Sequence, residues 1–169
     1  MIERVVDRLR CVTDDVIIIS NTPEVYSFLE LPVYTDVFQG VGALAGLHAA
    51  LHYAKQEVVA CVGCDMPLLE PALLSYLASL IPAHDAVVPQ TVEAEAAQLQ
   101  TLSAVYSKSC LPVIAEMVRE GERRVHALYS RINARIVPPE AWQAIDPHGL
   151  SFFNVNTPQD FEKATTYFR

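Results

Sequence analysis

The sequence of 169 residues lacks the features of membrane, secreted and nucleic-acid-binding proteins. No apolar run approaches the roughly 18 residues that a transmembrane helix needs. Residues 1–10 carry charges at a helical period and have no apolar segment typical of a secretion signal. Acidic residues outnumber basic ones by 20 to 12, and the net charge of −8 provides no positive field for nucleic acid. We therefore expect a cytoplasmic protein without a membrane or nucleic-acid partner.

The chain also lacks a convincing metal or redox motif. Its cysteines are few and lie mostly in apolar surroundings, as reduced thiols do: Cys11, Cys61, Cys64 and Cys110. Cys61 and Cys64 have redox spacing, but they run along a strand end and no second pair completes a zinc site. His48 and His52 lie four residues apart without the glutamate of a zinc-protease helix. We expect these two histidines to lie on a helix surface.

What the sequence does contain is the pattern of one α/β domain over residues 1–169. Hydrophobic residues make up 51% and charged residues 19%, which is enough for a core of ordinary size. Short connections in the first half predict a mostly parallel sheet with right-handed crossovers and helices on both faces. We expect strands at 16–19, 32–36, 57–62, 86–89, 101–106, 134–137 and 152–155, and helices at 2–10, 23–30, 43–54, 71–81, 109–119 and 158–168.

Polar side chains follow the first three predicted strands. These are Asn21, Asp36 and Asp65. Ligands of such sheets bind beyond the carboxyl ends of the strands, so the three residues predict a site there. Asp65 follows an apolar strand and precedes Pro67, and a carboxylate in this place suits Mg²⁺. The alternatives are ordinary loop residues at the first two positions and, for Asp65, a turn residue that caps the next helix.

Seven segments resemble, in order, segments of the MobA-type molybdenum cofactor guanylyltransferases. Gly42-Ala43-Leu44-Ala45-Gly46 is similar to the family's "GPLAG", with Ala43 in place of proline. The other six segments are Ser20–Glu24 ("NRPE"), Asp36, Val58–Pro67 ("DMP"), Gln100–Tyr106 ("QPLxAVY"), Gly121–Val125 ("GxRRV") and Phe153–Pro158 ("FxNVNTP"). Each motif alone is weak, but seven in sequence over nearly the whole chain are specific.

The resemblance implies a Rossmann-like nucleotidyltransferase that transfers GMP from GTP to the molybdopterin-bound molybdenum cofactor. The products would be the guanine dinucleotide cofactor and pyrophosphate. Catalysis would rest on positioning and on Mg²⁺, bound at Asp65, rather than on a protein nucleophile. The resemblance places the catalytic residue at Asp65, nucleotide contacts at Asn21, Asp36, Gly46 and Asp65, and molybdopterin contacts at Arg123, Arg124, Asn154 and Asn156.

Each of the molybdopterin contacts has an alternative. Guanidinium groups hold phosphate bidentately, so Arg123 and Arg124 suit the pterin phosphate, but a solvated helix end explains them too. Asn154 and Asn156 alternate with Val155 and would point to one face of a strand. The alternative for the asparagines is turn and capping polarity ahead of the following helix.

One departure from the family is large, because its first strand and glycine-rich phosphate loop are absent. No glycine precedes Gly40, and residues 1–6 already resemble the helix that follows that loop. A truncated chain, a misassigned start and a paralogue without the loop are all consistent with this. Rival functions are a nucleotidyltransferase that uses CTP or acts on another phosphate, and a non-catalytic protein that binds molybdopterin or other molybdenum cofactor proteins.

The absent strand would lie between the strands at 16–20 and 58–62. Adjacent strands lie about 4.8 Å apart, so its absence opens a gap of roughly 9–10 Å. Three outcomes are open: the two strands pair directly, another copy of the chain contributes to the gap, or the chain folds poorly alone. We expect association with another copy, because unpaired apolar edges recruit partners.

Overall fold

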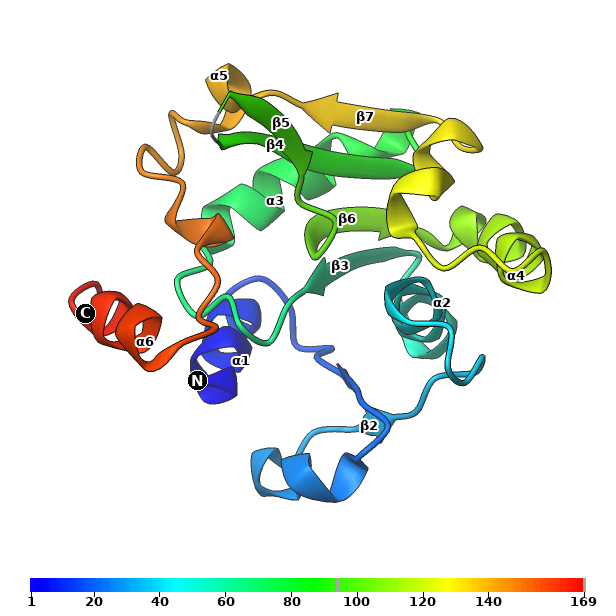
Figure 1. The fold of residues 1–169 in the computed structure, drawn as a ribbon, viewed down its shortest axis with the longest axis horizontal. Helices are drawn as coiled ribbons and strands as arrows, with labels where there is room; N and C mark the ends of the chain where they lie inside the picture. Colours follow the sequence, from blue (N-terminus) through cyan, green and yellow to red (C-terminus); the bar gives the residue numbers. More distant parts are fainter. Residues whose placement is uncertain (94, 169) are drawn as a thin grey trace.

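A five-stranded mixed sheet forms the centre of the structure (Figure 1). The computed structural model describes residues 1–93 and 95–168. The sheet has the order β3–β6–β4–β5, and β7 pairs with β4. Its strands are β3 (Val58–Val62), β4 (Ala86–Glu93), β5 (Ala96–Leu99), β6 (Ser103–Ser107) and β7 (Ala134–Val137). A separate parallel pair consists of β1 (Ile18–Ile19) and β2 (Val33–Tyr34).

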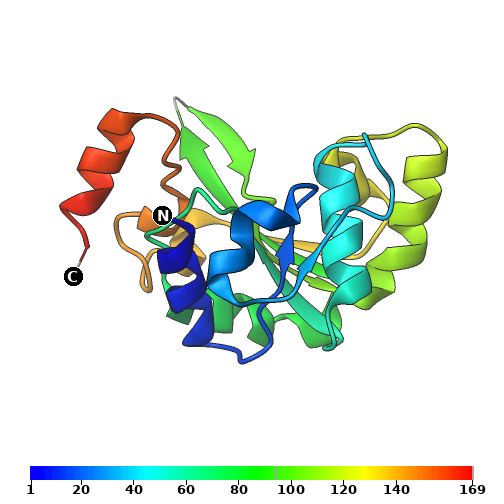
Figure 2. The ribbon, with the colours of Figure 1, turned by 90° about the horizontal axis from the view of Figure 1, so that it is seen from below.

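The expectation of a mostly parallel sheet is wrong, because two strands, β5 and β6, are reversed. β6 pairs antiparallel with both β3 and β4, so β3 and β4 run in the same direction, and β7 is parallel to β4. β4 and β5 form an antiparallel hairpin that projects from the sheet (Figure 2). β4 ends at Glu93 and β5 begins at Ala96, and a parallel return would need a connection of a dozen residues or more, so β5 is reversed. β6 follows β5 after three residues and pairs with the same strand in the same direction as β5.

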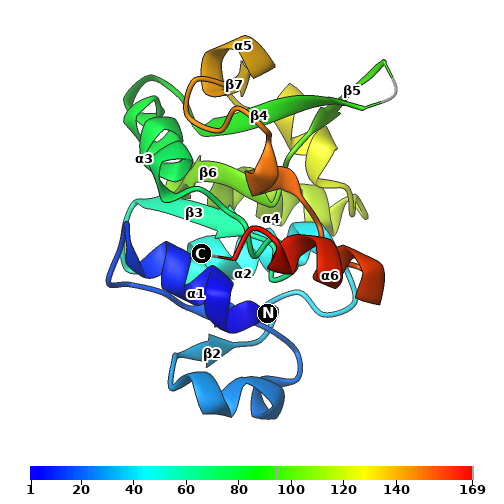
Figure 3. The same ribbon diagram turned by 90° about the vertical axis from the view of Figure 1, so that its left-hand side faces the viewer.

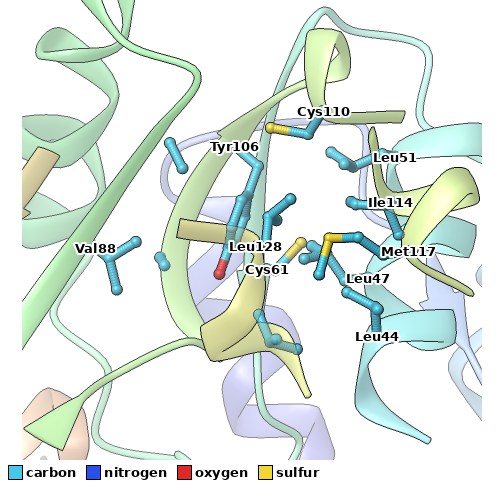
Figure 4. Packing of buried hydrophobic residues seen from close by; sticks show 13 residues of the cluster. Leu44, Leu47, Leu51, Cys61, Val88, Tyr106, Cys110, Ile114, Met117 and Leu128 are labelled. Carbon is cyan, nitrogen blue, oxygen red and sulfur yellow. The ribbon is translucent and has the colours of Figure 1, made fainter. Parts of the chain in front are cut away.

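Helices cover both faces of the sheet, as expected (Figure 3). On one face lie α2 (Ala43–Tyr53) and α4 (Leu111–Arg119), and on the other lie α3 (Pro71–Ser79) and α5 (Pro139–Trp142). Leu47, Leu51 and Ile114 pack against Tyr106 on the first face (Figure 4). Leu73 and the other core residues of α3 fill the second face. Burial of these apolar side chains is the main force that joins the helices to the sheet.

Several predicted elements are confirmed and others are wrong in type. α1 (Ile2–Arg10), α2 and α3 match their predicted ranges to within two residues, and α6 (Pro158–Thr165) begins with a capping box of Thr157 and Asp160. Residues Pro23–Leu29 form a 3₁₀ helix without a buried side chain, and another 3₁₀ turn, Lys108–Cys110, precedes α4. Further 3₁₀ helices occupy Ile81–Ala83 and Val125–Ser130. β5 was not predicted.

The predicted strand at 152–155 is also wrong. A 3₁₀ helix, Leu150–Phe152, occupies its start and residues 153–156 are irregular. The buried carboxylate of Asp146 accepts hydrogen bonds from the amides of Leu150 (3.0 Å) and Ser151 (2.8 Å). These bonds fold the backbone into a turn and leave no extended run to join the sheet.

Within the described residues, β1 and β3 do not pair with each other. β1 is hydrogen-bonded to β2 and β3 to β6, and a cavity lies between β1 and β3. Direct pairing of these strands, one of the three outcomes above, is therefore wrong, whereas association with another copy stays a prediction. In the same described part of the chain, no helix is both long and apolar enough to cross a membrane.

Candidate functional site

A hydrogen-bonded pair, Asn21 and Asp36, joins the ends of the first two strands. The side-chain amide of Asn21 donates from Nδ2 to Oδ2 of Asp36 at 2.9 Å, and the backbone amide of Asp36 donates to Oδ1 of Asn21 at 3.1 Å. The two residues follow β1 and β2, which run parallel, so both ends reach the same edge. The reciprocal bonds fix the orientation of the Asp36 carboxylate.

Gly46 lies beside this pair on α2. A Cβ atom at Gly46 would sit 3.9 Å from Oδ1 of Asp36. Asn21, Asp36 and Gly46 line one cavity of about 680 Å³, together with apolar residues of α1, α2, β1 and β3. The structure thus brings together three of the four predicted nucleotide contacts.

Asp65, the fourth, follows β3 and is half-buried. Its carboxylate makes no hydrogen bond or ion pair to another described residue, so its oxygens are open to a ligand. Oδ1 of Asp65 packs against the Cα of Gly63, where a Cβ would collide with it. Partial desolvation of its sulfur, together with the Asp65 carboxylate, raises the pKa of the neighbouring Cys64 thiol, which therefore stays neutral. The sequence analysis does not single out Gly63. Its position two residues before Asp65 is the one feature of the sequence that indicates this contact.

Asp65 suits a Mg²⁺ ion that is shared with a substrate. No group of three or more His, Cys, Asp or Glu residues within the described part of the chain could hold a metal by itself. Mg²⁺ commonly binds one or two carboxylates and completes its shell with substrate phosphates and water. A single open carboxylate at a strand end fits that mode.

The segment that carries Asn154 and Asn156 lies next to Asp65. The amide of Val155 donates to the carbonyl oxygen of Asp65 at 2.9 Å. Val155 is buried, whereas Asn154 and Asn156 are exposed, and neither asparagine side chain bonds to another described residue. Both amide groups are thus available to a ligand near Asp65.

Arg123 and Arg124 lie elsewhere. The segment after α4 and the segment before α6 are at opposite ends of the molecule (Figures 1 and 2). The carboxylate of Glu122 accepts bonds from Nε (3.0 Å) and Nη2 (2.9 Å) of Arg124, and from both arginine amides. These hydrogen bonds lower the pKa of Glu122 to about 2, and the bonds from the Arg124 side chain contribute most. The Arg124 guanidinium therefore already holds a carboxylate, while the Arg123 side chain is exposed.

The expectation of two surface histidines is wrong for His48. His48 is buried, because the segment before α2 folds over it and Phe38 meets its ring edge-on at 4.7 Å. Burial lowers the pKa of His48, and its Nδ1 has no partner among the described residues. Cys61 is buried, Cys64 is exposed, and both are free thiols.

Known proteins resemble the chain over nearly its whole length. It is 36% identical over 165 residues to a molybdenum cofactor guanylyltransferase of Desulfosudis oleivorans, covering 97% of this chain and 80% of that one. It is 33% identical over 168 residues to a probable molybdenum cofactor guanylyltransferase of Carboxydothermus hydrogenoformans, covering 99% and 83%.

Solved structures agree with this relationship. The crystal structure of molybdopterin-guanine dinucleotide biosynthesis protein A from Archaeoglobus fulgidus superposes with a TM-score of 0.81 at 26% identity, covering 99% of this chain and 84% of that one. A 2-C-methyl-D-erythritol 4-phosphate cytidylyltransferase of Thermus thermophilus shares the fold, with a TM-score of 0.73 at 17% identity, covering 99% and 88%. Residues 1–136 match the family described as the MobA-like NTP transferase domain. With its α/β nucleotidyltransferase fold, the chain belongs to the MobA-like NTP transferase family.

Proposed function

We propose that this protein transfers GMP from GTP to the molybdopterin-bound molybdenum cofactor. A terminal phosphate oxygen of molybdopterin attacks the α-phosphorus of GTP. The bond from that phosphorus to the oxygen bridging to the β-phosphate breaks, and pyrophosphate leaves with the electron pair. The relatives of this family, named as molybdenum cofactor guanylyltransferases, support this assignment. We place the reaction in the cytoplasm, which suits a chain with four free thiols.

The observation that carries the choice of GTP is the Asn21–Asp36 pair. A carboxylate only accepts hydrogen bonds, and guanine offers two adjacent donors, N1–H and the N2 amino group. Asn21 engages Oδ2 of Asp36, which leaves Oδ1 facing Gly46 and the cavity. Cytosine and adenine each offer one amino donor beside a ring-nitrogen acceptor, N3 or N1, so one of the two contacts would set two acceptors face to face. A site built to bond two donors binds such bases more weakly.

Asp65, Asn154 and Asn156 suit the part of the site in which the phosphate would be transferred. The open Asp65 carboxylate would hold Mg²⁺, which when bound would neutralise charge on the phosphate that is transferred. Asn154 and Asn156 lie beside Asp65 and would donate to the pterin substrate through their amide groups. Arg123 would bind its phosphate only if the substrate reaches the far end of the sheet, and Arg124 only after release from Glu122.

The test measures nucleotide binding and turnover separately. Calorimetry with Mg²⁺ compares GTP, CTP and ATP, and a second assay follows pyrophosphate release with molybdopterin-bound molybdenum. Asp36→Asn should weaken GTP binding by tenfold or more without raising the affinity for ATP. Asp65→Asn should abolish the part of the GTP affinity that depends on Mg²⁺. Asp14→Asn, on an exposed residue, is the matched control.

Two results would decide against the proposal. Equal affinity for CTP and GTP would remove the role of Asp36 in base choice. Binding of GTP and molybdopterin without pyrophosphate release, under conditions in which an active relative turns over, would favour the non-catalytic role.

A further inference from the structure

Residues 153–156 carry both asparagines of the candidate site but belong to no helix or strand. They lead into α6 beside the end of β3 (Figure 1). The amide of Val155 donates to the carbonyl oxygen of Asp65 at 2.9 Å and anchors the middle of this segment. Asn156 lies beyond that anchor, and its exposed side chain bonds to no other described residue. The direction of the Asn156 side chain therefore depends on the bonds that its backbone makes.

One carboxylate oxygen, Oδ2 of Asp160, accepts three hydrogen bonds from the two residues before α6. The amides of Asn156 and Thr157 donate to it at 3.3 and 3.0 Å, and the hydroxyl of Thr157 donates at 2.8 Å. A capping box requires this carboxylate to reach only the amide of the N-cap residue, Thr157. The bond from Asn156 is additional and has no part in capping the helix, because that amide precedes the cap.

These bonds restrain the backbone on both sides of the Asn156 Cα. The amide of Asn156 belongs to the peptide plane before that atom, and the amide of Thr157 belongs to the plane after it. Peptide planes are rigid, so only φ and ψ of Asn156 can change their relative orientation. Because both amides donate to one oxygen, the two angles are restrained, and with them the direction of the Cα–Cβ bond. The carboxylate thus orients the Asn156 side chain without a hydrogen bond to it.

The Asp160 carboxylate is ionised at neutral pH. The hydrogen bond from the Thr157 hydroxyl is the main cause that lowers the pKa of Asp160, and the two backbone amides contribute less. An ionised carboxylate only accepts hydrogen bonds, and bonds to a charged acceptor are stronger than those to a neutral one. The N-terminus of α6 also favours a negative charge at this position. The bonds that restrain Asn156 are therefore present at neutral pH.

We propose that Asp160 is a positioning residue, which holds Asn156 in the direction needed to donate to the molybdopterin substrate. This role rests on the proposed contact between Asn156 and that substrate, whereas Asp160 itself makes none. A backbone that is ordered before the substrate arrives avoids a loss of conformational freedom on binding. The Asn156 amide group stays exposed and has no partner among the described residues, so its own hydrogen bonds are left for the ligand.

Three variants separate this role from helix capping. Asp160→Ala should raise the KM for the molybdopterin substrate about tenfold, because a hydrogen bond to the substrate is lost, and should leave GTP affinity unchanged. Asp160→Asn keeps one acceptor oxygen and should restore the KM to within about twofold. Ser107→Ala is the matched control, because Ser107 caps a 3₁₀ helix with a bond from the amide of Ser109 (3.2 Å), at the end of β6 away from Asp65. It should lower the melting temperature without raising the KM.

A double-mutant cycle shows whether Asp160 acts through Asn156. In the Asn156→Ala background the side chain to be positioned is gone, so adding Asp160→Ala should change the KM by less than about twofold. The same addition should still lower the melting temperature as much as it does in the unaltered protein, because the cap of α6 is lost in both. A merely structural role would instead make the two KM effects multiply.

Nitrogen-15 relaxation gives a measurement that requires neither substrate nor turnover. The backbone amides of Asn156 and Thr157 should have order parameters of about 0.85 in the unaltered protein and in Asp160→Asn, and below about 0.6 in Asp160→Ala. The amides of Glu162 and Lys163, within α6, should stay ordered in all three proteins. Their order would show that the helix remains folded when the cap is removed.

Three results would overturn the proposal. The first is an Asp160→Ala protein in which the amides of Asn156 and Thr157 stay ordered. The second is a KM that rises as much in the Asn156→Ala background as in the unaltered protein, because Asp160 would then act elsewhere. The third is an equal rise of the KM in Ser107→Ala, which would trace the effect to lost stability. If the unaltered protein turns over no molybdopterin substrate, the proposed function fails, and the relaxation data alone decide whether Asp160 orders Asn156.

Discussion

The backbone amide of Val155 donates a hydrogen bond to the carbonyl oxygen of Asp65 at 2.9 Å. This bond joins two segments that are distant in the sequence and fixes the segment before α6 against the end of β3. Val155 is buried with Leu68 and Ala164 in a small apolar cluster, which anchors the same contact. The asparagines on either side of Val155 are consequently held near Asp65 while their side chains stay exposed.

The first prediction concerns these asparagines. The double variant Asn154→Ala, Asn156→Ala should leave stability within about 0.5 kcal/mol, because exposed side chains without partners contribute little. GTP affinity should be unchanged, whereas the KM for the molybdopterin substrate should rise at least tenfold. Steady-state kinetics with calorimetry for GTP would measure both, and an equal loss of GTP affinity would contradict the assignment.

The second prediction separates stability from binding at Gly46. Gly46→Ala should raise the free energy of unfolding by up to about 1 kcal/mol, because alanine is the better helix former and its Cβ meets no close contact. The same methyl group stands 3.9 Å from Oδ1 of Asp36, in the place proposed for the base. GTP affinity should therefore fall about tenfold, or about 1.4 kcal/mol.

Gly40→Ala provides the contrast for this experiment. Gly40 has a φ of 74°, a conformation that alanine adopts only at a cost of about 1–2 kcal/mol. Urea unfolding should show the two substitutions changing stability in opposite directions. A stabilised Gly46→Ala protein that binds GTP normally would remove Gly46 from the nucleotide site.

Local pattern was enough to predict the elements around the candidate site. An apolar run that ends in a polar residue specified β1 with Asn21 and β3 with Asp65, and Thr157 with Asp160 specified the start of α6. The contact between Asn21 and Asp36 also follows from the sequence, because parallel strands joined by a short helix end at the same edge. These features depend on residues close together in the chain.

The errors come from longer-range or competing interactions. The direction of β6 depends on its pairing with β3 and β4, because its own apolar sequence suits either direction. The helix pattern predicts a surface position for His48 because it carries no information about the loop with Phe38 that covers the ring. The predicted strand at 152–155 does not form because the buried Asp146 carboxylate accepts hydrogen bonds from the backbone just before it. The hydrophobic pattern of the sequence does not reveal such bonds.

The third prediction concerns a hydrogen-bonded pair of tyrosines, the buried Tyr106 of β6 and the half-buried Tyr129. The Tyr106 hydroxyl is 2.7 Å from that of Tyr129 and donates to the carbonyl of Thr101 at 2.8 Å. Tyr106→Phe should cost about 1–3 kcal/mol, because it leaves both partners without this bond in the core. Tyr129→Phe should cost less, since Tyr106 keeps its bond to Thr101. Denaturant unfolding would compare them, and equal losses would show that the two hydroxyls act as one unit.

The fourth prediction concerns the pH dependence of the Glu122–Arg124 pair. Hydrogen bonds from Arg124 and from two backbone amides lower the pKa of Glu122 from 4.5 to about 2 in the folded protein. A carboxyl whose folded pKa is lowered stabilises the protein above its unfolded pKa and loses that contribution as pH falls through the folded value. The stability advantage over Glu122→Gln should therefore be constant above pH 5 and decline between about pH 4.5 and 2. Thermal unfolding across this range would measure it.

The same variant tests whether Arg124 can bind a phosphate. Glu122→Gln removes the charge that Arg124 now pairs with, so the guanidinium gains the capacity to hold an anion bidentately. Pyrophosphate affinity at neutral pH should rise several-fold, and the gain should disappear in Glu122→Gln, Arg124→Gln. Glu120→Gln, which breaks the neighbouring pair with Arg131 at 2.7 Å, is the matched control and should not reproduce the gain. If Glu122→Gln leaves pyrophosphate affinity unchanged, Glu122 is not what keeps Arg124 from phosphate, and the predicted molybdopterin contact at Arg124 loses its support.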